Sequence, residues 1–273
     1  FIFENKKTFQ NASYAFDLRR RNGVKLELLN ANDLRQIEPM LTKHLYKGYR
    51  VSNIMHTYNP LYLVRSLFDL FSKRGGKFLQ QKVKGFEIGE EGVRSINISE
   101  DKLIIDKVVL AAGVWSRKLA KELGSHVPLE AERGYHIMFN GTDMKLKSTI
   151  MSVDRYISIT PMLKGIRAGG MAEFASIDTK ANMNNAKIIK HHAQSLFPNL
   201  NSDNITEWMG PRPSHPDSKP VIDRSPLHNN LYFAFGHDHI GFTLGGITGK
   251  VISELMTGKK TTLDLNPFKV DRF

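Results

Sequence analysis

The sequence predicts a mixed fold, part α+β and part α/β, for a chain of 273 residues. Two segments, 107–124 and 231–257, each contain an apolar strand, a small-residue turn and a helix, which is the pattern of a local α/β unit. The stretches between them, such as RGYHIMFNG, are rich in β-branched and aromatic residues and predict an antiparallel sheet. With 41% hydrophobic residues, the chain can bury a core as one large domain or two smaller ones.

The first 41 residues predict short alternating elements. FIFENKKTF at the start has the character of a strand, and residues 11–30 predict a helix, a turn at Asn22 and a short strand. In NANDLRQIEPML we expect Asn32 to be the N-cap of a helical turn that Pro39 closes.

The clearest amphipathic helix is NPLYLVRSLFDLFSKRGG, residues 59–76. Pro60 suits its first turn, and the Gly75-Gly76 pair predicts its end. Its apolar residues recur at helical spacing on one face: Leu63, Leu67, Leu70 and Phe71.

The rest of the chain predicts more strands and one long helix. Residues 77–113 predict short strands with turns at Gly89 and Gly92, and a hairpin turn is expected near Lys164-Gly165. NMNNAKIIKHHAQSLFP, residues 182–198, predicts a helix between β-rich blocks.

Composition excludes several classes of site. The absence of cysteine excludes disulfides, thiolate metal sites and a cysteine nucleophile, and it is compatible with a reducing compartment. No apolar run reaches the roughly 18 residues that a membrane-spanning helix needs. The net charge of +12 is scattered rather than gathered on a basic helix with aromatics, so nucleic acid is not an expected partner.

The most informative stretch is GHDHIGFTLGGITGK, residues 236–250, which follows the apolar run LYFAFG. Glycine at this density, where a strand turns into a helix, indicates a backbone lying close to something flat or anionic. The alternative is a tight strand-to-helix connection without a ligand. His237 and His239 lie two positions apart, but no third ligand follows at a suitable spacing, so no metal site is expected. In an extended segment Asp238 points away from both.

Three motifs occur in order: VVLAAGVWSRKLAKELG (108–124), WMGPRPSHPDSKPVI (208–222) and GHDHIGFTLGGITGKVISELMTGK (236–259). Together they resemble the FAD-dependent amino-acid oxidoreductases of the D-amino-acid oxidase superfamily, in particular its D-amino-acid dehydrogenase and glycine oxidase branch. RGYHIMF and IRAGGMAEF fit the same pattern, so the resemblance covers essentially the whole chain.

The resemblance implies a set of FAD-binding residues. The start of the helix after LYFAFG would offer backbone N–H groups and a partial positive charge to the flavin ring. Small residues after VVL would allow close approach to the dinucleotide, and a residue in QQKVKGF would touch its adenine side. The implied residues are Val83, Ala111, Ala112, Gly113, Gly236, His237, Gly241, Phe242, Thr243 and Leu244.

The resemblance also implies substrate-binding residues, of which Arg212 and Tyr156 are the catalytic candidates. Arg212 lies between two prolines, and its guanidinium suits an α-carboxylate through two parallel hydrogen bonds. Tyr156 would share that carboxylate, Met171 would shape the side-chain pocket, and His239 would face the substrate. For Tyr156 and Met171, ordinary core packing is the alternative. Their spacing predicts adjacent strands of one hairpin.

Family members open with a βαβ unit that carries G-x-G-x-x-G, and these 273 residues contain no such motif. We therefore expect the C-terminal part of a two-domain FAD-linked oxidoreductase, with an incomplete Rossmann-like FAD domain in which KVVLAAG and LYFAFG lack neighbours. Residues 1–76 and 125–207 would form the antiparallel-sheet substrate domain, and residues 77–124 and 208–273 the remainder of the FAD-binding domain.

The implied activity is oxidation of an amino acid to an imino acid, with a D-amino acid as the favoured substrate. Water then converts the imino acid to a 2-oxo acid and ammonia. Oxygen and a quinone remain open as electron acceptor. Alternatives are a sarcosine- or glycine-type secondary-amine oxidase, a hydroxyproline dehydrogenase, or a non-catalytic fragment or subunit that contributes the substrate side of a hetero-oligomer. The expected location is cytoplasmic, with peripheral association at the inner face of the bacterial cell membrane left open.

Overall fold

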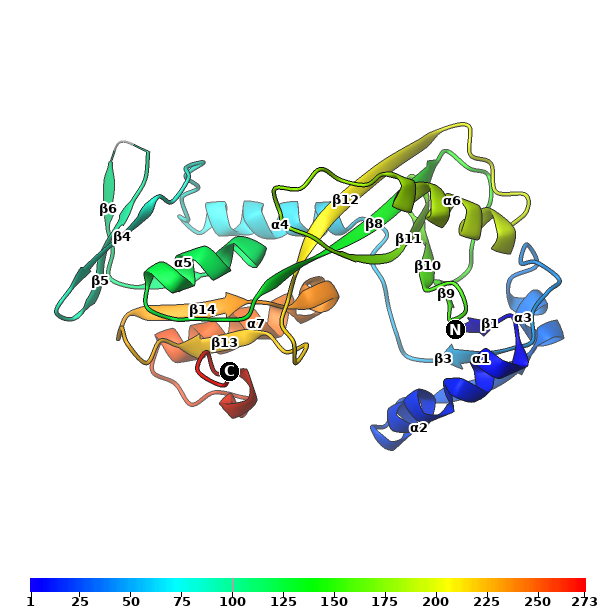
Figure 1. Ribbon diagram of the computed structural model, residues 1–273, viewed down its shortest axis with the longest axis horizontal. Helices are drawn as coiled ribbons and strands as arrows, with labels where there is room; N and C mark the ends of the chain where they lie inside the picture. The colour runs from blue at the N-terminus through cyan, green and yellow to red at the C-terminus, as the bar shows by residue number, and fades with distance from the viewer. Residues whose placement is uncertain (100) are drawn as a thin grey trace. The chain divides into compact units, whose positions relative to one another are not determined.

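The computed structural model describes residues 1–99 and 101–273. Its chain forms two compact units (Figure 1). Unit 1 consists of Phe1–Gly76, Gly134–Ala172 and Lys180–Gly210, and unit 2 consists of Lys77–Arg133, Glu173–Thr179 and Pro211–Phe273. The strands β8 (Glu130–Asn140), β11 (Gly165–Phe174) and β12 (Ile205–Ser214) contribute residues to both units. The assignment of a substrate role and an FAD role to parts of the chain stays a prediction.

A sheet of eight strands, in the order β12-β8-β11-β10-β9-β1-β3-β2, organises unit 1. Its remaining strands are β1 (Ile2–Phe3), β2 (Leu26–Asn30), β3 (Lys47–Val51), β9 (Ile150–Ser152) and β10 (Ile157–Met162). β10 and β11 pair antiparallel from Ile157↔Gly170 to Met162↔Gly165. The predicted hairpin turn near Lys164-Gly165 is therefore confirmed.

Helix α6 (Asn184–Leu196) covers one face of this sheet (Figure 1). Its apolar residues Ala186, Ile189 and Ala193 are fully buried against alternate residues of the strands, including Ile137 and Ile159. The helix predicted over 182–198 is thus present, and its apolar stripe forms the main core of unit 1.

The N-terminal elements differ in detail from the expectation. The opening strand ends at Phe3, because Asn5 caps the helix α1 (Lys6–Asn11) by accepting a hydrogen bond from the Thr8 amide. Helix α2 (Ser13–Arg21) follows, and Phe16 packs with Phe3 and Tyr49 in a small aromatic core.

The prediction of Asn32 as an N-cap is wrong by two positions. Asn30 caps the helix α3 (Ala31–Ile37) by accepting from the Asn32 and Asp33 amides, while the Asp33 carboxylate accepts from the Asn30 amide. This reciprocal capping box satisfies more end groups of the helix than Asn32 could.

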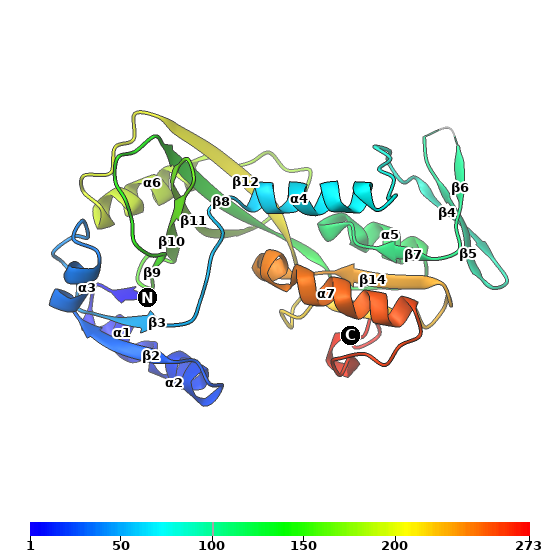
Figure 2. The same cartoon turned by 180° about the vertical axis from the view of Figure 1, so that it is seen from behind.

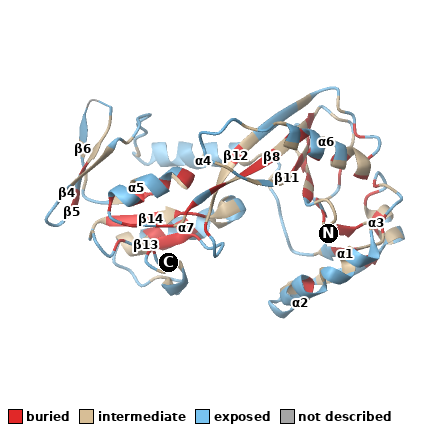
Figure 3. Cartoon of the chain, viewed as in Figure 1, coloured by how far each residue is buried: buried red, intermediate tan, exposed pale blue. Residues whose placement is uncertain are grey.

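Helix α4 (Pro60–Lys73) is the predicted amphipathic helix, and Asn59 caps it. Its apolar face is exposed: Leu67 is 58% exposed, and Phe71 is 49% exposed. Figure 3 shows the helix as almost entirely exposed.

Unit 2 contains a sheet in the order β13-β14-β7, formed by β13 (Val221–Arg224), β14 (Leu231–Phe235) and β7 (Val108–Leu110). The expectation that LYFAFG lacks neighbours is wrong, because β14 pairs with β13 on one side and with β7, in parallel, on the other. A second sheet joins β4 (Gly85–Gly89), β5 (Gly92–Asn97) and β6 (Lys102–Ile104).

Helices cover both faces of the β13-β14-β7 sheet. Phe233 and its alternate neighbours pack in one core with residues of α5 (Ser116–Glu122), and Tyr232 packs in another with Val251 of α7 (Gly241–Met256). Figure 2 shows α7 lying along this sheet, and Figure 3 shows its strands as largely buried. The two predicted α/β units are therefore present as parallel strands with their helices.

Short 3-10 turns complete the unit: η1 (Gly113–Trp115), η2 (Asp238–Ile240) and η3 (Asn266–Phe268). Among the described residues, no helix is both long enough and apolar enough to cross a membrane.

Candidate functional site

Two of the predicted segments meet at one edge of the β13-β14-β7 sheet. β14 and β7 run parallel, with Phe233 opposite Leu110, so the carboxyl ends of both strands lie at the same edge. Ala111–Gly113 follow β7, and Gly236 follows β14. Gly113 has φ +57°, and a Cβ there would meet open space. This edge, where the two connections leave the sheet, is the usual place for a ligand in an open parallel sheet.

The start of α7 lies beside this edge and has no side-chain cap. Its N-cap, Ile240, has no side chain that accepts a hydrogen bond, so none caps the first-turn amides of a 16-residue helix. Phe242 and Thr243 in that turn are exposed. Uncapped amides and the helix dipole favour a polarisable or anionic group at this position.

Two expectations about this segment are wrong. Residues 238–240 form a 3-10 turn rather than an extended segment, so Asp238 does not point away from His239: its carboxylate lies 3.2 Å from His239 Nδ1. Gly245 and Gly246 lie inside α7 and not in the turn.

The packing of the fold by itself requires a glycine at position 236. Its φ is +81°, and a Cβ would lie 2.2 Å from Nε2 of His215, which is 4% exposed. The structure therefore explains this glycine by the packing of the His215 ring, whether or not a ligand lies near.

The two histidines of the motif have different partners. Nε2 of His237 lies 2.9 Å from Oγ1 of Thr248, seven residues after the first residue of α7, so this contact holds the turn against the helix, and the FAD-binding role of His237 stays a prediction. Burial lowers the pKa of His237. Within the described part of the chain, no group of three or more His, Asp or Glu side chains could hold a metal ion.

Arg212 lies in β12 and pairs with a carboxylate. Its Nη1 donates to Oε1 of Glu132 on the neighbouring strand β8 at 2.6 Å. The side chains are 26% and 16% exposed, so the pair is only partly in contact with water. The contact with Glu132 fixes the orientation of the guanidinium, and the role of Arg212 as a carboxylate anchor stays a prediction.

Ser214 links this pair to the start of α7. Its hydroxyl donates to Oδ1 of Asp238 at 3.0 Å and also lies 3.4 Å from Oε2 of Glu132. Asp238 has φ +52°, a conformation uncommon outside glycine, and its side chain is 11% exposed. Arg212, Glu132, Ser214, Asp238 and His239 thus form one cluster within unit 2, which we call the Arg212 cluster.

Sequence reasoning missed three of these residues. Ser214 and Asp238 lie inside the motifs that carried the resemblance. Glu132 directly precedes RGYHIMF and extends that predicted strand by one residue. A carboxylate in such a strand is the one signal that was available, because it must find a partner if the strand is partly buried.

Tyr156 and Met171 lie near the same end of the β10–β11 hairpin in unit 1. Ile157 pairs with Gly170, Met171 follows in β11, and Tyr156 lies in the turn just before β10. The predicted adjacent strands are therefore present, but Tyr156 itself lies outside them. Both have positive φ, +53° and +65°, and Tyr156 is 80% exposed. Left-handed backbone at a tyrosine and a methionine is strained, and such strain collects at functional sites. Their meeting with Arg212, which belongs to unit 2, stays a prediction.

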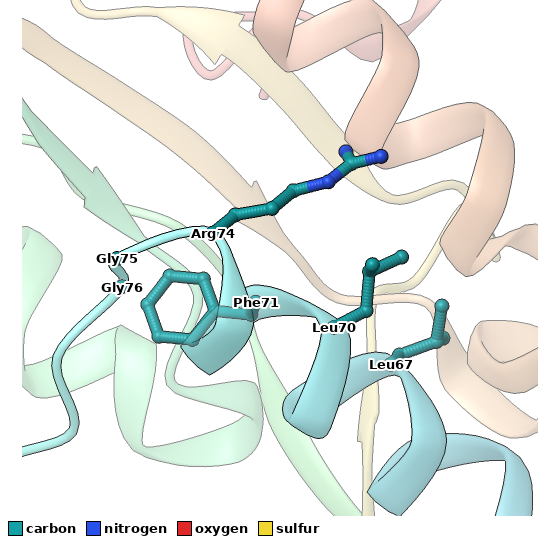
Figure 4. Close-up of a pocket in the computed structure, with 6 residues that line it drawn as sticks. All are labelled: Leu67, Leu70, Phe71, Arg74, Gly75 and Gly76. Carbon is teal, nitrogen blue, oxygen red and sulfur yellow. The ribbon is translucent and has the colours of Figure 1, made fainter.

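Two further features share no residue with the Arg212 cluster. Val83 precedes β4 of the β4-β5-β6 sheet, whereas Ala111–Gly113 follow β7 of the β13-β14-β7 sheet. The adenine-side role of Val83 stays a prediction. A pocket on α4 is lined by Leu67, Leu70, Phe71, Arg74, Gly75 and Gly76, with the Phe71 ring against Gly76 (Figure 4). It contains none of the predicted site residues.

The comparisons with known proteins decide the family. The model of the DAO family, described as FAD dependent oxidoreductase, matches residues 2–255. This chain belongs to that family. FAD is the cofactor of the DAO family, and its members are oxidoreductases.

A D-amino-acid oxidase from Bradyrhizobium diazoefficiens is 32% identical to the chain in an alignment 275 positions long, which covers 99% of this chain and 65% of that oxidase. The chain thus spans less than two thirds of the length of this curated relative.

Solved structures of DAO-like enzymes share the fold. Glycine oxidase from Geobacillus kaustophilus superposes with a TM-score of 0.86 at 19% identity, covering 100% of this chain and 74% of that one. L-proline dehydrogenase from P. horikoshii gives 0.81 at 19% identity, covering 100% and 75%. At this identity the likeness shows the fold alone.

The DAO-family residues at the sheet edge fit an FAD. Uncapped amides at the start of α7 and small residues after β7 offer backbone donors and close approach at one edge of the sheet. The first turn of α7 contains no acidic residue, so the dipole of the helix favours an electron-rich ring edge there.

Proposed function

We propose that this chain serves the FAD-dependent oxidation of an amino acid to the imino acid, with a D-amino acid as the favoured substrate. Water then converts the imino acid to a 2-oxo acid and ammonia. Membership of the DAO family and the likeness to a D-amino-acid oxidase over 99% of the chain support the proposal.

One structural observation carries it. The hydrogen bond from Ser214 to Asp238 ties the strand of Arg212 to the turn that precedes α7. Arg212, the proposed carboxylate anchor, therefore lies in the same unit as the segment whose backbone amides suit the cofactor, and a hydrogen bond from its own strand reaches the turn before that segment. Catalysis of this kind depends on orienting the reacting carbon more than on a strong protein base.

The side chains divide the work as follows. Arg212 binds the substrate carboxylate through its planar guanidinium. Glu132 orients that guanidinium, and Ser214 contacts Glu132 in turn. Tyr156 and Met171, at the end of their hairpin, are proposed to close on the substrate's carboxylate and side chain. FAD, when bound, supplies the oxidising power, and the amides of Gly241–Leu244 would hold its ring edge. The electron acceptor, oxygen or a quinone, is not assigned.

The test is Arg212→Ala in the full-length, FAD-loaded enzyme. We expect kcat/KM for amino acids to fall by about 100-fold or more, because two charge-assisted hydrogen bonds of roughly 3 kcal/mol together are lost. Arg212→Lys should recover little of it, since a point charge cannot reproduce the fork.

Arg117→Ala is the matched control, because Arg117 also pairs with a carboxylate on β8, that of Glu130, but on the exposed surface. It should change kcat/KM less than about twofold. Both enantiomers of alanine, with glycine and sarcosine, would show which substrate is preferred. Near-normal turnover by Arg212→Ala would refute the anchor role.

A further inference from the structure

We propose that Glu132 recognises the ammonium group of the substrate and so makes the site selective for amino acids over other carboxylic acids. This inference rests on the proposed function, because it takes Arg212 as the carboxylate anchor. It starts from the contact of 2.6 Å between Arg212 Nη1 and Glu132 Oε1.

The pair is complementary to a zwitterion. An amino acid carries its carboxylate and its ammonium on the same carbon, so opposite charges lie side by side. Arg212 and Glu132 also present opposite charges side by side, on the neighbouring strands β12 and β8. A zwitterion whose carboxylate binds Arg212 therefore brings its ammonium within reach of Glu132, where each charge meets its opposite.

The placement of Glu132 supports a role beyond charge balance. Along β8, Glu132 faces Arg212, whereas the next residue, Arg133, is 1% exposed and donates to the carbonyls of Ser176 and Thr179. Glu132 is only 16% exposed, and its second oxygen lies near the Ser214 hydroxyl. A carboxylate that is mostly removed from water interacts with neighbouring charges more strongly than a surface carboxylate does.

Glu132 also acts against the wrong ligand. A carboxylic acid without an ammonium group that binds Arg212 places its negative charge next to that of Glu132, with no positive charge of its own to offset the repulsion. Asp238, which the Ser214 hydroxyl links to Glu132, adds a second negative charge to the cluster. Repulsion of this kind is a common source of specificity. The pair should therefore lower affinity for simple acids and retain amino acids.

The experiment measures binding rather than turnover, using two acids of the same shape. 2-Aminoisobutyrate carries an ammonium but no hydrogen on its α-carbon, so it cannot be oxidised there. Pivalate has a methyl group where that ammonium stands. Their dissociation constants would be measured by calorimetry on the full-length, FAD-loaded protein, for the parent and for Glu132→Gln, Glu132→Asp, Arg212→Ala and Asp217→Asn.

We expect Glu132→Gln to weaken binding of 2-aminoisobutyrate by about tenfold or more, the effect of one close, partly desolvated charge pair, and to leave pivalate unchanged or tighter. Glu132→Asp keeps the charge and should keep part of the preference, which tests the idea even if the Gln variant folds poorly. Asp217→Asn removes a carboxylate that pairs with Arg272 in the same unit, and it should change neither affinity.

The outcomes separate the two proposals. If Arg212→Ala weakens both acids, but Glu132→Gln changes both by the same factor or changes neither, the ammonium role of Glu132 is wrong and the carboxylate anchor stands. The ammonium role is equally wrong if Asp217→Asn reproduces the effect of Glu132→Gln. If Arg212→Ala leaves both affinities unchanged, the anchor itself fails, and the role of Glu132 fails with it.

Discussion

Replacing Gly236 by alanine tests the packing behind the candidate cofactor edge. Gly236 connects β14 to the turn before α7 and has φ +81°. The added Cβ would lie 2.2 Å from Nε2 and 2.3 Å from Cδ2 of His215. The His215 ring cannot move aside easily, because it is 4% exposed and stacks on Phe273 with ring centroids 5.1 Å apart.

Two costs follow from this geometry. Left-handed backbone costs alanine about 1 kcal/mol more than glycine, and overpacking a closed site costs about 1–3 kcal/mol. We therefore expect unit 2 to lose roughly 2–4 kcal/mol of local stability. Hydrogen exchange of the backbone amides of β13 and β14 measures this loss directly, and exchange should accelerate by about 30- to 1,000-fold.

A second variant separates the two costs. Adding His215→Ala to Gly236→Ala removes the clash but not the strained φ, so the cost specific to Gly236→Ala should fall to about 1 kcal/mol when it is measured in the His215→Ala background. Gly245→Ala is the control, because a Cβ there meets nothing within 4 Å, and alanine favours a helix. Exchange within about threefold of the parent in Gly236→Ala would refute the argument.

Two further predictions concern unit 2. Arg133→Met removes the charged donor to the Ser176 and Thr179 carbonyls, so the 173–179 segment should lose about 3 kcal/mol of local stability and be cleaved faster in limited proteolysis; an unchanged cleavage rate would contradict this. Burial, assisted by the charge of Arg272, lowers the pKa of His215 from 6.5 to about 4. The unfolded chain therefore binds a proton that the folded chain resists, so this contribution is complete above pH 6.5 and is lost as the pH falls toward 4, by up to roughly 3 kcal/mol. His215→Phe should reduce this acid sensitivity in the β13–β14 amides, and parallel pH curves for parent and variant would count against it.

The sequence alone determined the elements whose cause is local. Helical spacing and the Pro60 and Gly75 signals placed α4, and the turn at Lys164-Gly165 placed the hairpin of β10 and β11. In the same way, ordered motifs along the chain were enough to predict the DAO family, which the family model then matched. The helix and the hairpin depend on residues within a few positions of one another, so periodicity and turn chemistry suffice for them, whereas the family was predicted from the resemblance of the motifs.

Caps and short turns were harder to predict, although they are also local. Asn30 and Asn32 are both good N-cap residues, and only the reciprocal bond with Asp33 selects Asn30. Likewise, Asp238 turns toward His239 because residues 238–240 form a 3-10 turn, a choice that the sequence left open.

Only the tertiary structure decided the Arg212 cluster and the reason for Gly236. Glu132 and Arg212 are 80 positions apart and meet because β8 and β12 are neighbours in one sheet. Gly236 must be a glycine partly because His215, 21 positions earlier in the chain, fills the space beside it. Contacts of this kind follow from strand pairing and register, and a side chain's own neighbours in the sequence carry no record of which strand lies beside it.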